Sequence, residues 1–582
     1  MATNQLLPAG VPGENMGGVT LCYTAEHTAK LRLCREDGTE LAAWSLPAAS
    51  EPRTLLVPVK VEADCKTAFI PENGLRLLEW RFHPEREMVV GQNPLTAMDF
   101  PDVDMIRVGD TYYMISTTMY FMPGGVILRS YDLIHWEYCT RIYDILEDTP
   151  AQRLEGSNAY GAGMWAATLR WHKGTFYVIF VANDTKKTYL YRAENIEGPW
   201  RRSYIEGFYH DCSLLFDDDD RAYLVYGQRH IHLLELNDEL TGPREGGLRR
   251  IIADSGESRY LGYEGSHLYK IGGKYYLFAI HSRKDRWRRV ESCLVSDSLE
   301  GEFRGGVVMD DDMGRTDAGV AQGGIIDTPD GRWYAILFQD VGAVGRIPML
   351  MPMTWENDMP VLGLDGKIPT EICNLTTRPG HVYKPLWASD DFAADTLSEV
   401  WEWNHIPDLS LVTLGGGQLR IRTGKTTPVL TQVKNMLTQR TLYPGCSGEI
   451  TLDGSGLHSG DRAGLCALQY CWAWIGLEKR ADGYRIAMHS RRPGDGEEGV
   501  ERISLPWQKS SVQLKAEMDF SCDLVRFFYR TAEGWQQLGE AHEMFFKLEH
   551  FTGNRFGLFV QSTQQAGGEA VYGSFVMQPL ED

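Results

Sequence analysis

The chain has 582 residues, of which 43% are apolar, and this is too long for one hydrophobic core, so two to four domains are expected. Its formal net charge of -21 argues against a nucleic-acid partner, because phosphate contacts need a surplus of lysine and arginine on one face. The 60 glycines and 11% aromatic residues suit short strands joined by tight turns, and they predict an all-β protein.

The N-terminal segment MATNQLLPAGVPGENMGG has neither the basic start nor the apolar core of a signal peptide. No stretch approaches the roughly 20 apolar residues of a membrane span. The eleven cysteines include no CxxC pair and no regular spacing, which favours free thiols over disulfides or a zinc site. We therefore expect a cytoplasmic protein with no membrane partner.

Residues 1–90 contain four alternating or apolar runs of the kind that form strands. The runs are KLRLC at 30–34, ELAAWSL at 40–46, TLLVPVKV at 54–61 and RLLEWRF at 76–82. This segment predicts a small N-terminal β-domain.

The next segment repeats one unit five times, a glycine or acidic turn followed by an aromatic-rich apolar strand. The copies are GDTYYMIS at 109–116, HKGTFYVIF at 172–180, DDDRAYLVYG at 218–227, IGGKYYLFA at 271–279 and DGRWYAILF at 330–338. Their aromatic positions are 47 to 64 residues apart, which is close to the length of a four-stranded blade. We predict a five-bladed β-propeller over residues 91–375.

A turn-rich linker at 376–392 follows, and strands with period-2 alternation then resume. They are QLRIRTG at 418–424, GEITLDG at 448–454, GLCALQY at 464–470, YRIAMHS at 484–490, VQLKAEMDF at 512–520, LVRFFYR at 524–530 and FGLFVQS at 556–562. This pattern predicts a C-terminal antiparallel β-sandwich over 388–582.

Acidic residues stand just ahead of the apolar strands that would enter three of the blades. Asp99, Asp102 and Asp104 precede the first, Asp211 precedes the third, and Glu264 precedes the fourth. Apolar flanks would desolvate Glu264 and raise its pKa, as a general acid requires. Residues at equivalent blade positions converge on one end of the axis, and two carboxyl groups there suffice to hydrolyse a glycosidic bond.

Five motifs occur in order along this region. They read QNPLTAMDFPDVDMIRVGDTYY at 92–113, STTMYFMPGGVILRSYDLIHWE at 116–137, GMWAATLRWHKGTFYVIF at 163–180, EGSHLYK at 264–270 and QGGIIDTPDGRWYAILFQDVGAVGRIPMLMPMTW at 322–355. Together they resemble glycoside hydrolase family 43. WEWNHIPD at 401–408 and RAGLCALQ at 462–469 look like the sandwich domain often fused to these enzymes, whereas residues 1–90 lie outside the resemblance.

The resemblance implies a role for each candidate residue. Asp102 would be the base that activates water, Asp211 the modulator that orients the acid, and Glu264 the general acid. Arg346 in GRIPML matches an arginine that contacts the sugar and the modulator. Walls of the terminal-sugar subsite would come from residues that offer faces or hydrogen bonds to a sugar, namely Trp165, Met119, Tyr120, Phe121 and Gln322.

The chain departs from the family pattern at several positions. Val103 and Ala167 replace prolines of the D-P-D and W-A-P motifs, which leaves the carboxylates in place. Ala321 stands where many relatives have a histidine that helps to hold a cation on the axis, so we expect no family-type calcium site and no required cofactor. Tyr120 also stands where close relatives often have histidine.

These observations predict an inverting exo-glycosidase that releases terminal β-D-xylose or α-L-arabinofuranose from plant cell-wall oligosaccharides. Two alternatives stay open at this point. One is a galactan or arabinan hydrolase on the same scaffold, and the other is a carbohydrate-binding protein that has lost catalysis. The sequence leaves the oligomeric state open.

Overall fold

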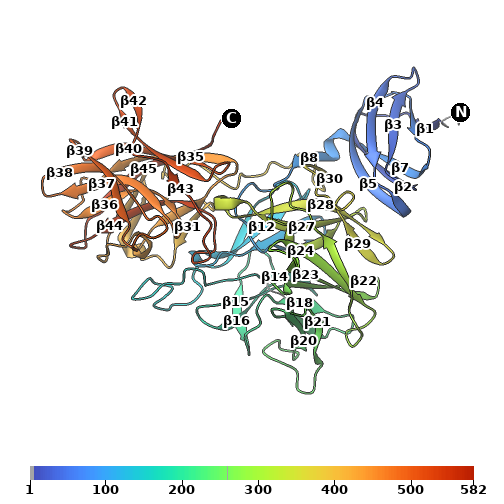
Figure 1. The fold of residues 1–582 in the computed structure, drawn as a ribbon, viewed down its shortest axis with the longest axis horizontal. Coiled ribbons are helices and arrows are strands. Elements are labelled where there is room, and N and C mark those ends of the chain that lie inside the picture. Colours follow the sequence, from blue (N-terminus) through green and yellow to red (C-terminus); the bar gives the residue numbers. More distant parts are fainter. Residues whose placement is uncertain (1–5, 258–259, 582) are drawn as a thin grey trace.

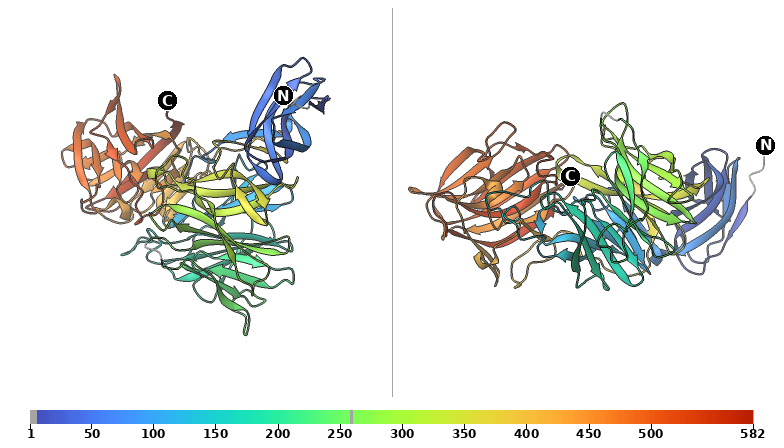
Figure 2. Two further views of the ribbon diagram at one scale, coloured as in Figure 1. Left: turned by 45° about the vertical axis from the view of Figure 1, so that its right-hand side comes forward. Right: turned by 90° about the horizontal axis from the view of Figure 1, so that it is seen from below.

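The computed structural model describes residues 6–257 and 260–581 and is built almost entirely of β-strands. Helix in this part of the chain is confined to single 3-10 turns, at Glu85–Glu87, Gly342–Val344, Leu409–Leu411 and Leu430–Gln432. None of the helices described is long and apolar enough to cross a membrane. The all-β prediction is confirmed. Figures 1 and 2 show the N-terminal sheets and the C-terminal sheets at opposite ends, with five further sheets between them.

Two small sheets form the N-terminal end of the molecule. One contains β1 (Leu7–Gly10), β6 (Thr67–Pro71), β3 (Ala29–Arg35) and β4 (Glu40–Leu46) in this spatial order, and the other contains β5 (Ala49–Val61), β2 (Met16–Ala25) and β7 (Leu75–Pro84). Alternate residues of β2 and β3 are buried, including Val19, Leu21, Leu31 and Leu33, and they form one core with Phe69. The alternating runs of the sequence thus pack two sheets face to face.

Five four-stranded antiparallel sheets follow, and within each sheet the strands lie in chain order. They are β9 (Asp104–Val108), β10 (Thr111–Ser116), β12 (Gly124–Ser130) and β13 (Glu137–Tyr143); β14 (Thr168–His172), β15 (Thr175–Ala182), β16 (Lys187–Ala193) and β17 (Arg201–Ile205); β18 (Ser213–Phe216), β19 (Ala222–Tyr226), β20 (His230–Glu235) and β21 (Arg249–Asp254); β22 (Glu264–Ile271), β23 (Lys274–Ser282), β24 (Arg289–Ser296) and β25 (Arg304–Met309); and β26 (Ala321–Asp327), β27 (Trp333–Asp340), β28 (Arg346–Glu356) and β29 (Met359–Leu362).

The repeated aromatic strand is the second strand of each sheet. The first strands contact one another in a cycle, β9 with β14, β14 with β18, β18 with β22, β22 with β26, and β26 with β9. The ends of these strands therefore surround one central region, and residues that precede them are brought together there.

Two larger sheets make the C-terminal part. One runs β31 (Trp401–Asn404), β34 (Leu437–Arg440), β44 (Arg555–Ser562), β36 (Asp461–Leu468), β37 (Ala473–Arg480), β38 (Gly483–Ser490) and β39 (Val500–Trp507); the other runs β32 (Val412–Gly415), β33 (Gln418–Arg422), β45 (Glu569–Pro579), β35 (Gly445–Asp453), β40 (Ser511–Asp519), β41 (Leu524–Thr531) and β42 (Gly534–Gln537), with β43 (His542–Glu543) beside β41. Side chains such as Leu465 and Leu514 meet in the core between them, so the two sheets form a sandwich.

The sandwich and the five sheets share hydrogen bonds and buried charge. The short strand β11 (Phe121–Met122), which follows β10, pairs with β31 and so extends a sandwich sheet. Glu402 is fully buried and forms ion pairs with Arg440, Arg555 and Arg141. Burial opposes ionisation of Glu402, but the three guanidinium groups outweigh it and hold the pKa of this carboxyl far below its usual range. The two parts are therefore joined as one body.

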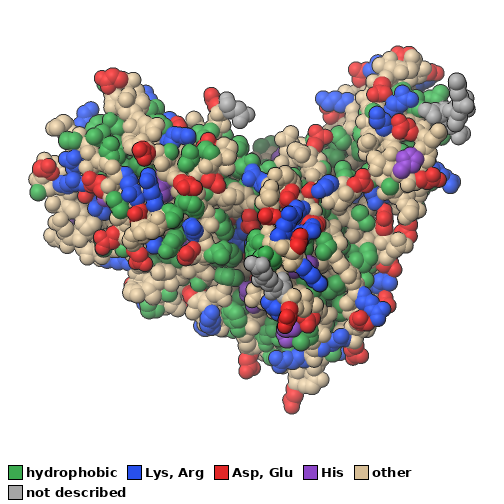
Figure 3. Space-filling model, viewed as in Figure 1, with side chains coloured by type: hydrophobic (Ala, Val, Ile, Leu, Met, Phe, Trp, Pro, Cys, Tyr) green, Lys and Arg blue, Asp and Glu red, His purple; other side chains and the backbone are tan. Residues whose placement is uncertain are grey.

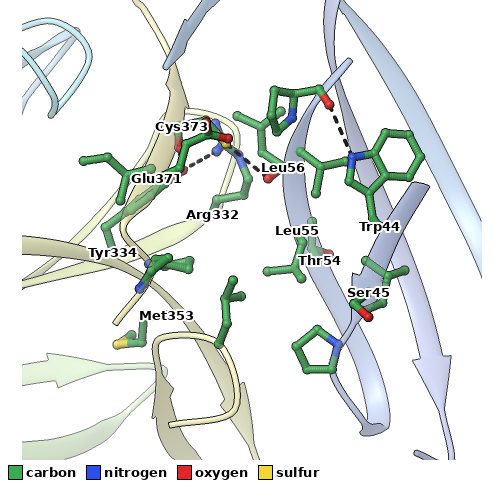
Figure 4. Close-up of a pocket in the computed structure, with 18 of the residues that line it drawn as sticks. Trp44, Ser45, Thr54, Leu55, Leu56, Arg332, Tyr334, Met353, Glu371 and Cys373 are labelled. Carbon is green, nitrogen blue, oxygen red and sulfur yellow. Dashed lines mark hydrogen bonds between the residues drawn. The ribbon is translucent and has the colours of Figure 1, made fainter. Parts of the chain in front are cut away.

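At the opposite end, the N-terminal sheets rest on the last of the five sheets. Arg53 forms an ion pair with Glu356 at 2.5 Å. The strand β30 (Glu371–Leu375) pairs with β8 (Met88–Gln92), which follows the N-terminal sheets in the chain. A cavity of about 330 Å³ lies at this junction. Figure 4 shows Trp44 on one of its walls and Tyr334 on the other. On the molecular face of Figure 3, acidic and basic side chains intermingle.

Candidate active site

The three predicted carboxyl residues lie directly before, or at the start of, first strands of the sheets. Asp102 precedes β9, Asp211 precedes β18, and Glu264 is the first residue of β22. Because these strands belong to the central cycle, their beginnings meet. Ligand atoms of His210, Asp211 and Glu264 all lie within 4.8 Å of one another, and the charge of Asp102 acts on Asp211. The structure thus brings all three carboxyl residues together.

The backbone at this site adopts an uncommon conformation. Asp102, Asp211 and Gln322 have φ values of +54°, +49° and +62°, and each stands close to the start of a first strand. Non-glycine residues rarely occupy this left-handed region, and they concentrate at functional sites where the surrounding structure holds them. Asp is one of the residues that tolerate it best. The turn points each side chain toward its neighbours on the adjacent sheets.

Asp102 is paired with a buried arginine. Arg346 donates from Nη1 to Asp102 Oδ1 at 2.6 Å, and only 2% of its side chain is exposed. The guanidinium carbon lies 5.3 Å from the centre of the Phe338 ring and 4.5 Å from that of Phe551. A buried guanidinium that contacts two aromatic rings is strongly held, and this fixes the Asp102 carboxyl group that it pairs with.

Among the described residues, no arginine forms an ion pair with Glu264 or Asp211. Burial, and then the charge of Asp211, raise the pKa of Glu264 to about 7, while Gln228 donates to its Oε2 at 2.9 Å. Burial, and then the charge of Asp102, raise the pKa of Asp211 to about 7. Asp211 accepts a hydrogen bond from the Gly265 N–H at 3.1 Å, so it fixes the backbone beside Glu264. The pair therefore binds a proton more tightly than ordinary carboxyl groups do.

His210 completes this cluster. Its Nε2 lies 3.6 Å from Asp211 Oδ2, and burial lowers its pKa, so the imidazole is neutral near pH 7. Within the described ranges only one other group of side chains is close enough to hold a metal ion, namely Glu478, His489 and Glu501 on the sandwich. Arg480 pairs with both carboxylates of that second group.

Trp165 lies beside the cluster, as a sugar-stacking residue should. Its ring centre is 5.7 Å from that of His210 and 5.2 Å from that of Phe551, and the side chain is half-buried. Its Nε1 has no hydrogen-bond partner in the described structure. Phe551 comes from the sandwich, in the loop between β43 and β44, so the C-terminal part contributes to the wall of the site. No motif of the sequence singled out this residue.

Three side chains of the 119–123 loop do not line the sugar site as the sequence predicted. Met119, Tyr120 and Phe121 are at most 1% exposed and belong to a core shared with the sandwich. Tyr120 stacks on His405, with ring centres 4.9 Å apart, and its hydroxyl meets Thr552 Oγ1 at 3.3 Å. These three side chains offer no surface to a sugar. They support the site from behind and are not part of its wall.

Gln322 lies against the turn that carries Glu264. A Cβ on Gly265, whose φ is +58°, would lie 2.7 Å from Gln322 Cδ, so the amide packs on the Gly265 backbone. The Gln322 N–H donates to Glu291 Oε2 at 2.8 Å. Glu291 is fully buried, and burial raises its pKa to about 8. Gln322 is therefore held beside the turn that carries the acid candidate.

Ala321 stands at the position where many family members have a histidine that helps to hold a cation. Ala321 is fully buried and offers no ligand atom. Nearby, between the first strands, Asp104 Oδ2 accepts hydrogen bonds from Arg170 Nη1 at 2.6 Å and from the Leu169 N–H at 2.9 Å. The guanidinium of Arg170 already balances this buried carboxylate. These residues do not fit a calcium ion.

A carboxylate paired with arginine, beside a second carboxyl group whose pKa is near neutral, defines an acid–base glycoside hydrolase. The sequence signature of Glycosyl hydrolases family 43 matches residues 91–360, and that of the β-xylosidase C-terminal concanavalin A-like domain matches residues 389–578. The chain therefore belongs to glycosyl hydrolases family 43. Neither signature covers residues 1–90.

Curated relatives carry related names. A β-xylosidase of Formosa agariphila is 27% identical over 381 residues, which are 58% of this chain and 62% of that protein. The non-reducing end α-L-arabinofuranosidase BoGH43B of Bacteroides ovatus is 30% identical over 359 residues, or 57% of this chain and 64% of that protein. The chain thus spans slightly less than two thirds of these two relatives.

Solved structures agree with this assignment. A bifunctional GH43-CE protein of Bacteroides eggerthii superimposes with a TM-score of 0.78 at 39% identity, covering 84% of this chain and 64% of that one. A GH43 glycoside hydrolase engineered to display both endo-xylanase and exo-arabinofuranosidase activity gives a TM-score of 0.75 at 30% identity, covering 84% of this chain and all of that one.

Proposed function

We propose that the chain is an inverting exo-glycosidase that releases terminal β-D-xylose or α-L-arabinofuranose from plant cell-wall oligosaccharides. One observation carries the proposal, namely the different environments of Asp102 and Glu264. Arg346 pairs with Asp102 at 2.6 Å, whereas burial raises the pKa of Glu264 to about 7. The arginine partner suits Asp102 to the role of the base, and the raised pKa suits Glu264 to the role of the acid. The β-xylosidase and arabinofuranosidase names of the relatives support the pentose.

The reaction that follows from these roles is a single displacement. Asp102 takes a proton from a water molecule, whose oxygen attacks the anomeric carbon. The bond from that carbon to the glycosidic oxygen breaks, and Glu264 protonates the leaving oxygen. Asp211, which accepts the Gly265 N–H, keeps the acid oriented and adds the negative charge that raises its pKa. Trp165 and Phe551 would enclose the terminal sugar, and this favours release of single units.

We also propose the domain architecture of the chain and its cellular location. The cyclic contacts of the first strands support a five-bladed β-propeller over residues 91–375, between a small β-domain at 1–90 and the sandwich at 388–582. All eleven cysteines are free in the described structure, which supports a reducing, cytoplasmic compartment and short imported oligosaccharides as substrates.

A panel of nitrophenyl glycosides of xylose, arabinofuranose and galactose tests the function. Hydrolysis of the β-xyloside or the α-L-arabinofuranoside is expected, and proton NMR of the first product should show the anomer opposite to that of the substrate. A product that keeps the configuration would refute the inverting mechanism. Turnover only of the galactoside, or only of internal bonds in an arabinan tested beside the panel, would favour the galactan or arabinan hydrolase. Sugar binding without turnover would favour the binding protein.

A further inference from the structure

Asp99 lies three residues before the base candidate Asp102, and its carboxylate joins two distant segments. Oδ1 accepts a hydrogen bond from the Arg346 N–H at 2.7 Å, and Oδ2 accepts one from the Gly553 N–H at 2.9 Å. Asp99 is only 5% exposed, so bulk water does not compete for either bond. One side chain therefore holds the start of β28 and the loop before β44 side by side.

The junction around Asp99 is too close for side chains on its two glycines. A Cβ on Gly553 would lie 1.9 Å from the Val344 carbonyl oxygen. A Cβ on Gly345, where φ is +108°, would lie 2.4 Å from Asp99 Oδ1. Only glycine permits this approach of the backbones. The carboxylate is thus enclosed by main chain, and small shifts of either segment would break its bonds.

The two segments that Asp99 joins carry parts of the sugar site. Arg346 donates to Asp102 at 2.6 Å and, through Nη2, to the Phe551 carbonyl oxygen at 3.4 Å. Phe551 stands two residues before Gly553, with its ring against Arg346 and against Trp165. A shift at Gly553 would therefore move the Phe551 ring and loosen its contact with Arg346.

Asp99 is itself held by the core of the sandwich. Its carbonyl oxygen accepts from Arg440 Nε at 3.0 Å, and Arg440 pairs with Glu402, also at 3.0 Å. Backbone and side chain of Asp99 are both fixed across the interface.

We propose that Asp99 is a positioning residue for glycoside hydrolysis. Its carboxylate locks the sandwich loop that carries Phe551 onto Arg346, and so fixes the wall of the sugar site. The inference rests on the proposed function, and Asp99 acts through Phe551 and Arg346 without touching the sugar.

The test compares Asp99→Asn with Asp523→Asn in the full-length protein. Asparagine keeps the size of Asp99 but turns an NH2 group toward one of the two backbone N–H donors, so one bond is lost. KM for the nitrophenyl pentoside should rise about tenfold while kcat changes less than about threefold, because the wall binds the sugar without doing chemistry. Asp523 is the matched control, since its carboxylate accepts the Ala343 N–H at 3.1 Å across the same interface. In the described structure its side chain makes no hydrogen bond to Arg346 or Gly553. Its KM should stay within about twofold of wild type.

A double variant tests the route of the effect. In a Phe551→Ala background, which has already lost the wall, Asp99→Asn should change KM by less than about twofold. A full tenfold effect in that background would overturn the role of Phe551.

Hydrogen exchange of residues 545–554 gives a readout that needs no activity. Exchange should be faster in Asp99→Asn and unchanged in Asp523→Asn. Unchanged exchange in Asp99→Asn, or equal rises of KM in the two variants, would overturn the proposal. If the wild type cleaves no pentoside, the proposed function fails, and exchange alone still decides whether Asp99 locks the loop.

Discussion

Replacing Glu264 by glutamine keeps its shape but removes the transferable proton. Burial raises the pKa of this carboxyl from an ordinary 4.5 to about 7. At pH 6 about 90% of such groups are protonated, against about 3% at the ordinary value, so the environment supplies roughly thirtyfold more acid. With activity dependent on the protonated form, kcat should fall as pH rises through about 7. In Glu264→Gln this alkaline limb should disappear.

The assay compares leaving groups in wild type and Glu264→Gln. A natural xylosyl or arabinosyl linkage leaves poorly and needs protonation, so its kcat should fall by about 10²–10⁴, whereas a nitrophenyl glycoside should lose much less. Glu291→Gln is the control, because burial also raises the pKa of Glu291, to about 8, and no role in catalysis is proposed for it. Equal losses on both substrates, or an alkaline limb that persists in Glu264→Gln, would refute the assignment of the acid.

Three further outcomes are expected. Arg346→Lys should lower kcat about a hundredfold in steady-state assays, because a lysine cannot pair with Asp102 and also reach the Phe551 carbonyl as a planar guanidinium does; near-normal kcat would contradict this. Glu402→Ala leaves three buried guanidinium groups without their carboxylate and should lower the free energy of unfolding by about 3–5 kcal/mol in urea titrations, whereas a loss below about 1 kcal/mol would show that the network contributes little. Exhaustive dialysis against EDTA should leave activity unchanged, since Ala321 offers no ligand atom; a loss that calcium restores would show that other ligands hold an ion.

The repeats of the sequence predicted the parts of the fold that local pattern determines. Each aromatic-rich copy is the second strand of one four-stranded sheet, from Tyr112 in β10 to Trp333 in β27. Period-2 alternation also predicted the two-sheet packing of the C-terminal part. The carboxyl residues could be found because each precedes a first strand, and equivalent positions in successive sheets converge.

Local sequence patterns could not predict the contacts between the five central sheets and the C-terminal sandwich. Phe551 and Asp99 meet the site through residues more than 200 positions away, and neither has a periodic or motif signature of that contact. Tyr120 was assigned to the sugar site from the family resemblance, but it is completely buried in a core shared with the sandwich. Such contacts depend on how two surfaces fit together, and local sequence patterns do not reveal them.

The two-residue strand β11 affects whether the sandwich can be produced as a separate polypeptide. Phe121 and Met122 pair with Asn404 and Trp403, so β11 covers the β31 edge of a sheet whose other seven strands all belong to the sandwich. An uncapped edge presents unpaired N–H and C=O groups to any passing chain. A polypeptide of residues 388–582 alone would expose the unpaired N–H and C=O groups of β31, together with the apolar surface of Trp403. We therefore expect the sandwich to be more prone to self-association when it is separated from the residues that carry β11.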